Sequence, residues 1–175
     1  TDSIGLLRDL SERQRIDLRN RRTLLLGAGG AAYAVAYALV DAGVTELIIC
    51  NRTPERADEL ADRIGDPMRV HTRYWADLSD CGNFDLIVNS TSAGHSNSTL
   101  SLPFSLASSR VLCYDLSYGK AAQSFLSWAR AASAAYIFDG LGMLIEQAAE
   151  AFYIWHGIRP DTESVYQQLR AEQCS

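Results

Sequence analysis

The chain has 175 residues, of which 47% are hydrophobic and 21% are charged, a composition typical of a globular domain with a sizeable core. Its formal net charge of −5 disfavours a general nucleic-acid-binding surface, since such surfaces are basic. No apolar run approaches the roughly 18 residues needed to cross a bilayer, so we expect a cytoplasmic protein without a membrane partner. The cysteines and histidines show no metal-ligand spacing, and no metal site is predicted.

Short apolar runs alternate with amphipathic stretches along the chain. Strands are predicted at residues 23–26, 46–50, 69–71, 84–89, 111–114 and 135–138, and helices at 4–13, 30–42, 54–64, 121–132, 141–155 and 162–171. The runs at 24–26 and 86–88 are apolar at successive positions, which is typical of strands buried on both faces. The alternation therefore predicts an α/β fold, a doubly wound, mostly parallel sheet with helices on both faces.

A glycine-rich turn follows the first predicted strand and opens the next helix, where residues 27–32 read GAGGAA. This fits the G-x-G-x-x-G/A pattern of Rossmann-type dinucleotide-binding domains in its proper context. Gly27 permits the tight turn, Gly29 lets the backbone approach a pyrophosphate, and Ala32 lets the helix pack closely on the strand. The pyrophosphate then lies at the helix N-terminus, where free N–H groups and the positive end of the helix dipole favour it. A turn that serves packing alone is the alternative.

The end of the second predicted strand indicates which dinucleotide is bound. NAD-binding folds usually place Asp or Glu there, about 20 residues after the glycines, to bind the ribose hydroxyls. This chain has Asn51, Arg52 and Thr53 instead, and Arg56 follows Arg52 at i+4, a spacing that places two side chains on one side of a helix. Two guanidinium groups and a hydroxyl suit a 2′-phosphate, so the predicted cofactor is NADP(H). The alternative is a solvated basic face whose arginines pair with Glu55, Asp58 and Glu59.

A third segment, residues 89–94 with the sequence NSTSAG, ends a buried strand with small polar residues and a glycine. Ligands of open α/β sheets bind beyond the carboxyl ends of the strands. We therefore expect the hydroxyls of this segment, including that of Thr91, to line the nicotinamide ribose. A plain turn that caps the strand is the alternative.

Further segments together resemble the shikimate dehydrogenase family, along nearly the whole chain and most closely in its bacterial biosynthetic type. They are TDSIGL at 1–6, NRT at 51–53, YDLSY at 114–118, and DGLGML at 139–144 leading to QAAEAF at 147–152 and Trp155. Members of this family reduce 3-dehydroshikimate reversibly to shikimate with NADPH, in aromatic amino-acid and chorismate biosynthesis. They combine an N-terminal substrate domain with a C-terminal Rossmann domain, and helices that act as a hinge join the two.

The resemblance implies that Gly27, Ala28, Gly29, Gly30 and Ala31 contact the pyrophosphate and that the 2′-phosphate lies at residues 51–56. It also implies roles for residues that spacing alone does not single out. Near the nicotinamide it places Leu116, Gly140 and Met143, and near shikimate it places Tyr118 and Gln147. Asp2 matches the family's substrate-binding aspartate, which partners a catalytic lysine of the N-terminal domain. Lys120, the only lysine in this sequence, does not match that lysine. Taken by themselves, Tyr118 reads as a packing residue, Gln147 as an exposed helix residue and Met143 as part of the core.

By the same resemblance, residues 1–175 form a single NADP-binding domain with a core at about 20–139 and flanking hinge helices at 4–13 and 141–171. We expect the N-terminal substrate domain to be absent and the chain alone to be inactive. The hinge helices should then expose an apolar patch and promote self-association, through some of Leu6, Leu7, Leu10, Ile145, Phe152 and Trp155. Two other functions stay open: a quinate/shikimate dehydrogenase with relaxed cofactor use, and a non-catalytic NADP-binding sensor or interaction module.

Overall fold

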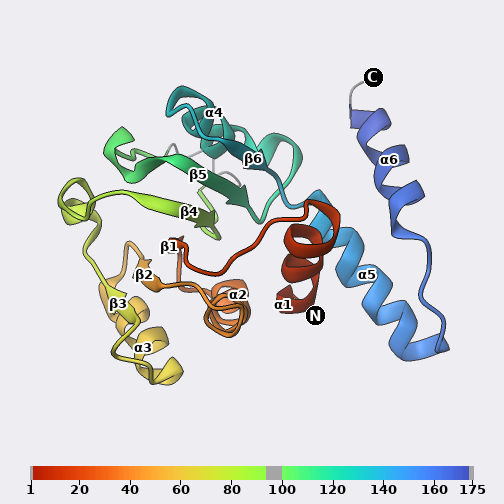
Figure 1. The fold of residues 1–175 in the computed structure, drawn as a ribbon, viewed down its shortest axis with the longest axis horizontal. Helices are drawn as coiled ribbons and strands as arrows, with labels where there is room; N and C mark the ends of the chain where they lie inside the picture. Colours follow the sequence, from red (N-terminus) through yellow and green to blue (C-terminus); the bar gives the residue numbers. More distant parts are fainter. Residues whose placement is uncertain (1, 94–99, 174–175) are drawn as a thin grey trace.

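The computed structural model describes residues 2–93 and 100–173. Six strands form one sheet: β1 (Arg22–Leu26), β2 (Glu46–Cys50), β3 (Val70–Thr72), β4 (Phe84–Asn89), β5 (Ala107–Asp115) and β6 (Tyr136–Phe138). Their order is β3-β2-β1-β4-β5-β6, and each neighbouring pair in this list is parallel (Figure 1). The predicted doubly wound α/β sheet of the Rossmann type is therefore confirmed. The chain changes its winding direction between β1 and β4, the point at which such sheets bind ligands.

The helices lie close to their predicted positions. They are α1 (Asp2–Leu7), α2 (Gly30–Asp41), α3 (Pro54–Ile64), α4 (Gln123–Ala131), α5 (Leu141–His156) and α6 (Thr162–Gln173). Helix α1 continues as a π-helical turn, η1 (Arg8–Arg13), so the predicted helix at 4–13 changes pitch midway. Short 3₁₀ turns at η2 (Trp75–Asp80), η3 (Phe104–Leu106) and η4 (Gly119–Ala122) complete the chain.

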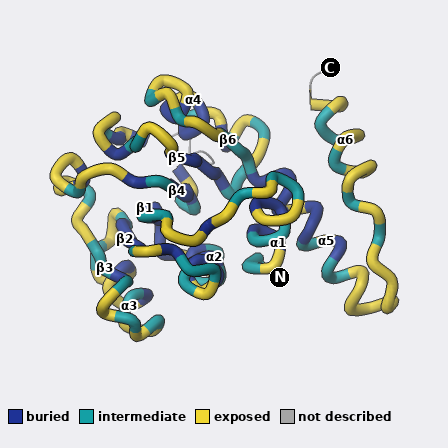
Figure 2. The backbone as a smooth tube through the Cα atoms, viewed as in Figure 1, coloured by how far each residue is buried: buried dark blue, intermediate teal, exposed yellow. Residues whose placement is uncertain are grey.

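Each face of the sheet has its own apolar cluster, because successive strand residues point to opposite faces. Leu25 of β1 packs in the cluster that α1, α2 and α3 cover, whereas Leu24 and Leu26 pack in the cluster that α4 covers. Figure 2 shows the resulting buried centre along the strands, with exposed segments at the periphery. Both faces of the central strands are thus covered, so a ligand can reach the sheet at the carboxyl ends of its strands.

Strand β5 is longer than the predicted strand at 111–114. Its first half contains Ser108, Ser109 and Arg110, which are partly or fully exposed, and the register with β4 shifts between Phe84 and Leu86. Hydrophobicity identifies only the buried second half, because Ala107 is the one first-half residue in register with β4, and Ser109 and Arg110 are exposed.

Helices α1 and α5 approach closely through glycines. A Cβ atom on Gly5 would lie 2.6 Å from Cγ of Gln147 and 2.7 Å from the carbonyl oxygen of Met143, and one on Gly142 would overlap the carboxylate of Asp9. The close contact brings the start of the chain against the helix that carries Gln147.

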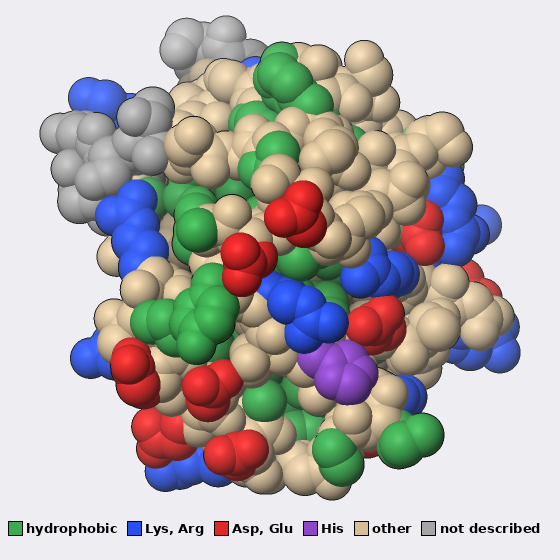
Figure 3. Space-filling view, turned by 90° about the vertical axis from the view of Figure 1, so that its left-hand side faces the viewer, with side chains coloured by type: hydrophobic (Ala, Val, Ile, Leu, Met, Phe, Trp, Pro, Cys, Tyr) green, Lys and Arg blue, Asp and Glu red, His purple; other side chains and the backbone are tan. Residues whose placement is uncertain are grey.

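The expected apolar patch contains some of the six residues named for it, and other side chains of α5, such as Tyr153 and Ile154, are exposed as well. Leu6 and Leu10 are 0% exposed and Ile145 is 6% exposed, since α1 and η1 pack against α5 and the sheet. The prediction holds for Phe152 and Trp155, which are 43% and 78% exposed. None of the helices in the described part of the chain is long and apolar enough to span a membrane. On the side of the molecule that carries β3 and α3, acidic and basic side chains are interspersed (Figure 3).

Candidate functional site

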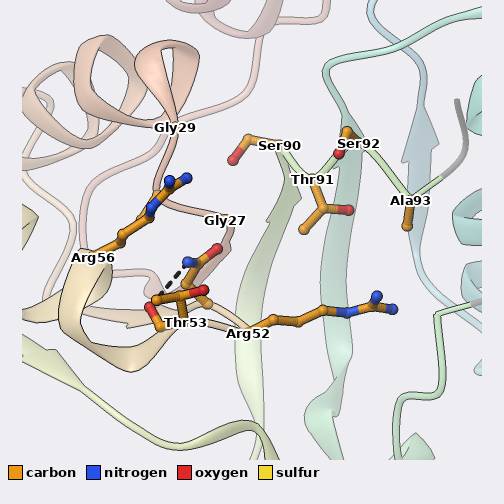
Figure 4. A pocket seen from close by; sticks show the side chains of 11 residues that line it. Gly27, Gly29, Arg52, Thr53, Arg56, Ser90, Thr91, Ser92 and Ala93 are labelled. Atoms are coloured by element: carbon orange, nitrogen blue, oxygen red, sulfur yellow. Dashed lines mark hydrogen bonds between the residues drawn. The ribbon is translucent and has the colours of Figure 1, made fainter. Parts of the chain in front are cut away.

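A pocket of about 330 Å³ lies at the carboxyl ends of β1, β2 and β4, where the sheet reverses its winding. Three short segments line it: Gly27, Ala28 and Gly29; Asn51, Arg52, Thr53 and Arg56; and Ser90, Thr91, Ser92 and Ala93 (Figure 4). The three segments singled out in the sequence thus meet at one place. Gly94, the last residue of the third segment, lies outside the described residues.

Backbone hydrogen bonds fix the ends of the three strands relative to one another. The amide of Gly27 donates to the carbonyl of Cys50 at 2.8 Å, and the amide and hydroxyl of Ser90 both donate to the carbonyl of Leu26, at 2.8 and 2.7 Å. Gly27 has φ +108°, and a Cβ atom there would overlap Oγ of Ser90. Glycine is therefore required at position 27 by the protein itself, as the tight-turn role predicts.

Gly29 differs from Gly27 in this respect. It is the N-cap of α2 with φ −85°, and a Cβ atom built on it meets no atom within 4 Å. Neither backbone strain nor packing within the described chain calls for glycine here, whereas a ligand that approaches the backbone closely would. The free amides and positive dipole end of α2 face the same space, which makes it suitable for a phosphate group.

The second segment supplies positive charge. Arg52 and Arg56 are both exposed, and neither forms an ion pair with a described residue. The alternative in which acids neutralise them is not observed in the described part of the chain: Glu59 pairs with Arg63, Asp58 accepts a hydrogen bond from Thr72, and Glu55 pairs with neither arginine.

The arrangement of the two arginines differs from the one predicted. Helix α3 begins at Pro54, so Arg52 precedes it, and the i, i+4 geometry of a helix does not apply. Figure 4 shows the Arg56 side chain directed toward the glycine turn and that of Arg52 extending toward Ser92 and Ala93. The two guanidinium groups therefore lie on different sides of the pocket. Thr53 is the N-cap residue, but its side chain makes no capping bond; Nδ2 of Asn51 donates to its carbonyl at 3.0 Å.

The residues that the resemblance places near the nicotinamide lie next to this pocket rather than in it. The amide of Leu116 donates to the carbonyl of Asn89 at 3.0 Å, and the amide of Gly140 donates to that of Ser117 at 2.8 Å. A Cβ atom on Gly140 would overlap the carbonyl of Leu116. Met143 is only 5% exposed and packs in the apolar cluster with α1 and α2, so its interpretation as a core residue is correct for this structure.

The three residues implied in substrate binding form two groups. Nε2 of Gln147 donates to Oδ1 of Asp2, so that these two side chains meet between α1 and α5. Tyr118 is 46% exposed and lines a separate hollow with Leu141, Leu144, Leu169, Glu172 and Gln173. Gly30 and Ala31, in the first turn of α2, are not among the residues that line the main pocket.

The Cys50 thiol, which lies near the site, is not activated as a nucleophile. Burial raises the pKa of Cys50, at the end of β2, to about 12, so the thiol stays protonated and weakly nucleophilic. Among the described residues no cluster of His, Cys, Asp or Glu has the arrangement of a metal site. Asn89 and Asp115 are two buried polar residues beside the pocket. Both lie in segments that the sequence singled out, but neither was given a role of its own, because nothing in the sequence shows that the two side chains meet.

Comparisons with known proteins agree with the geometry. The family model described as Shikimate / quinate 5-dehydrogenase matches residues 9–111, and that of the Shikimate 5'-dehydrogenase C-terminal domain matches residues 140–170. The chain is 60% identical over 174 residues to a shikimate dehydrogenase (NADP(+)) of Xylella fastidiosa strain M12, covering 98% of this chain and 62% of that protein. The chain therefore spans less than two thirds of the length of this curated relative.

Solved structures share the fold of this chain. An Ael1 enzyme from Pseudomonas putida superposes with a TM-score of 0.87 at 43% identity, covering 96% of this chain and 61% of the other. A shikimate 5-dehydrogenase from Thermus thermophilus, solved with NADP(H) and shikimate, superposes with a TM-score of 0.75 at 30% identity, covering 97% of this chain and 61% of the other.

Proposed function

The chain belongs to the shikimate/quinate 5-dehydrogenase family, and from this premise we propose that it forms the NADP(H)-binding part of a cytoplasmic shikimate dehydrogenase. That enzyme reduces 3-dehydroshikimate reversibly to shikimate in aromatic amino-acid biosynthesis. The observation that carries the proposal is the pocket itself, which joins a glycine turn at a helix N-terminus to two arginines without an ionic partner among the described residues.

At the adenosine end, Asn51, Arg52, Thr53 and Arg56 would hold the 2′-phosphate. The end of β2 has no carboxylate to bind an unmodified ribose, and none of the residues that line the pocket is acidic. Charge-assisted bonds from guanidinium groups to a phosphate are among the stronger hydrogen bonds in proteins. Because exposed arginine side chains rotate freely, the two groups can close on the phosphate from different sides.

At the centre of the cofactor, Gly27, Ala28, Gly29, Gly30 and Ala31 would hold the pyrophosphate. The open space at Gly29 and the free amides of the first turn of α2 support this assignment. These features fit NADP(H), which supplies the hydride for ketone reduction when bound.

At the other end, Thr91, Leu116, Gly140 and Met143 would surround the nicotinamide nucleoside. Asp2, Gln147 and Tyr118 would bind the substrate, and the contact between Asp2 and Gln147 supports a shared role for these two. No lysine of this sequence matches the family's catalytic lysine, so we propose that the part of the relatives' length not spanned here supplies the substrate domain. The exposed Phe152 and Trp155 on α5 would then pack against that domain, or against a second copy of this chain.

Calorimetric titration with NADP⁺ and NAD⁺ tests the proposed cofactor. We expect clear binding of NADP⁺ and much weaker binding of NAD⁺. Comparable affinities would favour a quinate/shikimate dehydrogenase with relaxed cofactor use, and no binding of either nucleotide would refute the proposal.

A further inference from the structure

Two buried polar residues connect the ends of β4 and β5 beside the pocket. Asn89 is 3% exposed and Asp115 is 1% exposed, and Nδ2 of Asn89 donates to Oδ2 of Asp115 at 3.0 Å. The other carboxylate oxygen, Oδ1, accepts the backbone amide of Ser117 at 2.8 Å. Both oxygens of Asp115 therefore accept from N–H groups, and the amide group of Asn89 must turn its nitrogen toward the carboxylate.

This orientation determines what Asn89 presents to Thr91. Its Oδ1 accepts the backbone amide of Thr91 at 3.1 Å and the hydroxyl of Thr91 at 2.7 Å. A backbone N–H can only donate and a carboxylate can only accept, so the bond from the Thr91 amide and the bond to Asp115 both prevent the Asn89 amide from flipping. The Thr91 hydroxyl consequently donates its single hydrogen to Oδ1 of Asn89.

Thr91 lines the pocket on its β4 side (Figure 4). With its hydrogen engaged, the hydroxyl oxygen has only lone pairs to offer toward the pocket. A phosphate oxygen would be repelled there because it also lacks a hydrogen to donate, whereas an O–H or N–H group of a ligand would be bound. The pocket thus combines donors at Arg52, Arg56 and the first turn of α2 with an acceptor at Thr91.

We propose that Asp115 and Asn89 are positioning residues that hold the Thr91 hydroxyl as an acceptor for a hydrogen-bond donor of the nicotinamide nucleoside, either a ribose hydroxyl or the carboxamide NH₂. The inference rests on the proposed function, since it takes the ligand to be NADP(H). It adds a directional constraint to the site: phosphates bind where the arginines and the free amides of α2 donate, and a donor group of the nicotinamide half binds at Thr91. The order in which the cofactor lies across the sheet is then encoded by hydrogen-bond direction as well as by charge.

The experiment compares NADP⁺ with 2′,5′-ADP, which lacks the nicotinamide half, by calorimetric titration of the 175-residue chain. Thr91→Val removes the acceptor with little change in shape, and we expect it to weaken NADP⁺ roughly three- to tenfold while 2′,5′-ADP binds as to the wild type. Thr91→Ser is the matched control and should retain NADP⁺ affinity. Asp115→Asn should weaken NADP⁺ selectively, as Thr91→Val does. The new amide offers a donor as well as an acceptor to Asn89, so that it no longer fixes the orientation of the Asn89 amide.

A purely structural role would weaken both ligands together, so equal losses for NADP⁺ and 2′,5′-ADP would overturn the inference. Unchanged NADP⁺ binding by Thr91→Val would overturn it as well, and this variant retains the buried Asn89–Asp115 pair if Asp115→Asn fails to fold. A wild-type chain that binds neither ligand would instead refute the proposed function. The 3-acetylpyridine analogue of NADP⁺ has a methyl group in place of the carboxamide NH₂. If the effect of Thr91→Val vanishes with this analogue, the donor is the carboxamide; if it persists, the donor is a ribose hydroxyl.

Discussion

The phenolic oxygen of Tyr114 lies 2.5 Å from Oδ2 of Asp9, although 105 positions separate the two residues in the chain. Both side chains are buried, and the bond ties β5 to the π-helical turn that follows α1. Arg13 extends the connection, because it bonds Asp9 at 3.0 Å and Glu146 of α5 at 2.8 Å. One polar network therefore joins β5, η1 and α5, the helix that carries Gln147.

Removal of the Tyr114 hydroxyl group should destabilise the fold. Tyr114→Phe takes one hydrogen bond from a buried carboxylate, and such a loss costs about 1–3 kcal/mol. We expect a lower urea midpoint with an unchanged m value. Tyr136→Phe is the control, because Tyr136 is 47% exposed. Equal midpoints for Tyr114→Phe and the wild type would show that the network adds nothing to stability.

Asp9 should also give stability a characteristic pH dependence. Burial is the main cause that raises its pKa above the ordinary value of 3.8, while bonds from Tyr114 and Arg13 act in the opposite direction. The folded protein then binds a proton at Asp9 more readily than the unfolded chain does, so the contribution of Asp9 falls as pH rises from 3.8 through the raised pKa. The unfolding free energy of the wild type should thus decrease relative to that of Asp9→Asn as pH rises from 3.8 through the raised pKa.

Asp85 provides a control of opposite sign. A hydrogen bond from Arg110 is the main cause that lowers its pKa from 3.8 to about 2. Its contribution to stability is complete above 3.8 and is lost as pH falls toward 2. The unfolding free energy of the wild type should therefore increase relative to that of Asp85→Asn as pH rises from 2 to 3.8. If the wild type changed in the same direction relative to Asp9→Asn and to Asp85→Asn, the opposite pKa shifts assigned to Asp9 and Asp85 would be contradicted.

The two glycines of the turn should respond differently to alanine. Gly29→Ala should fold normally, because the added methyl meets no protein atom, but it should weaken NADP⁺ roughly tenfold or more by occupying the space of the pyrophosphate. Gly27→Ala should lower the melting temperature, since it combines φ +108° with an overlap on Ser90. Thermal unfolding and calorimetric titration of both variants separate the two effects. Normal NADP⁺ binding by Gly29→Ala would exclude close approach of the cofactor at this residue.

Incubation of the 175-residue chain with NADPH and 3-dehydroshikimate should not oxidise the nucleotide. The only lysine, Lys120, is exposed on η4 and does not match the family's catalytic lysine. Absorbance of the reduced nicotinamide reports the reaction, and a full-length relative under the same conditions is the positive control. Clear turnover by this chain would contradict the proposal that further residues complete the active site.

Much of the fold and part of the site could be predicted because their signals are local. The glycine turn, the residues after β2 and the strand end at Thr91 each lie within a few consecutive positions, and the parallel sheet brings them together at one edge. The Tyr114–Asp9 bond and the Asn89–Asp115 pair could not be predicted, because each joins residues far apart in the chain. The relative direction of Arg52 and Arg56 was predicted wrongly, because the i, i+4 rule holds only within a helix and Arg52 precedes α3, which begins at Pro54 as predicted.

The central claim is that Arg52 and Arg56 select the phosphorylated adenosine ribose. Its most direct test is the ratio of the NADP⁺ and NAD⁺ dissociation constants for Arg52→Ala, Arg56→Ala and the double variant, with Arg63→Ala as a control that pairs with Glu59 outside the pocket. Each bond to a charged group contributes about 1.5–3 kcal/mol, so the double variant should bind NADP⁺ at least roughly tenfold more weakly and NAD⁺ almost unchanged. A parallel loss for the two nucleotides would contradict the claim.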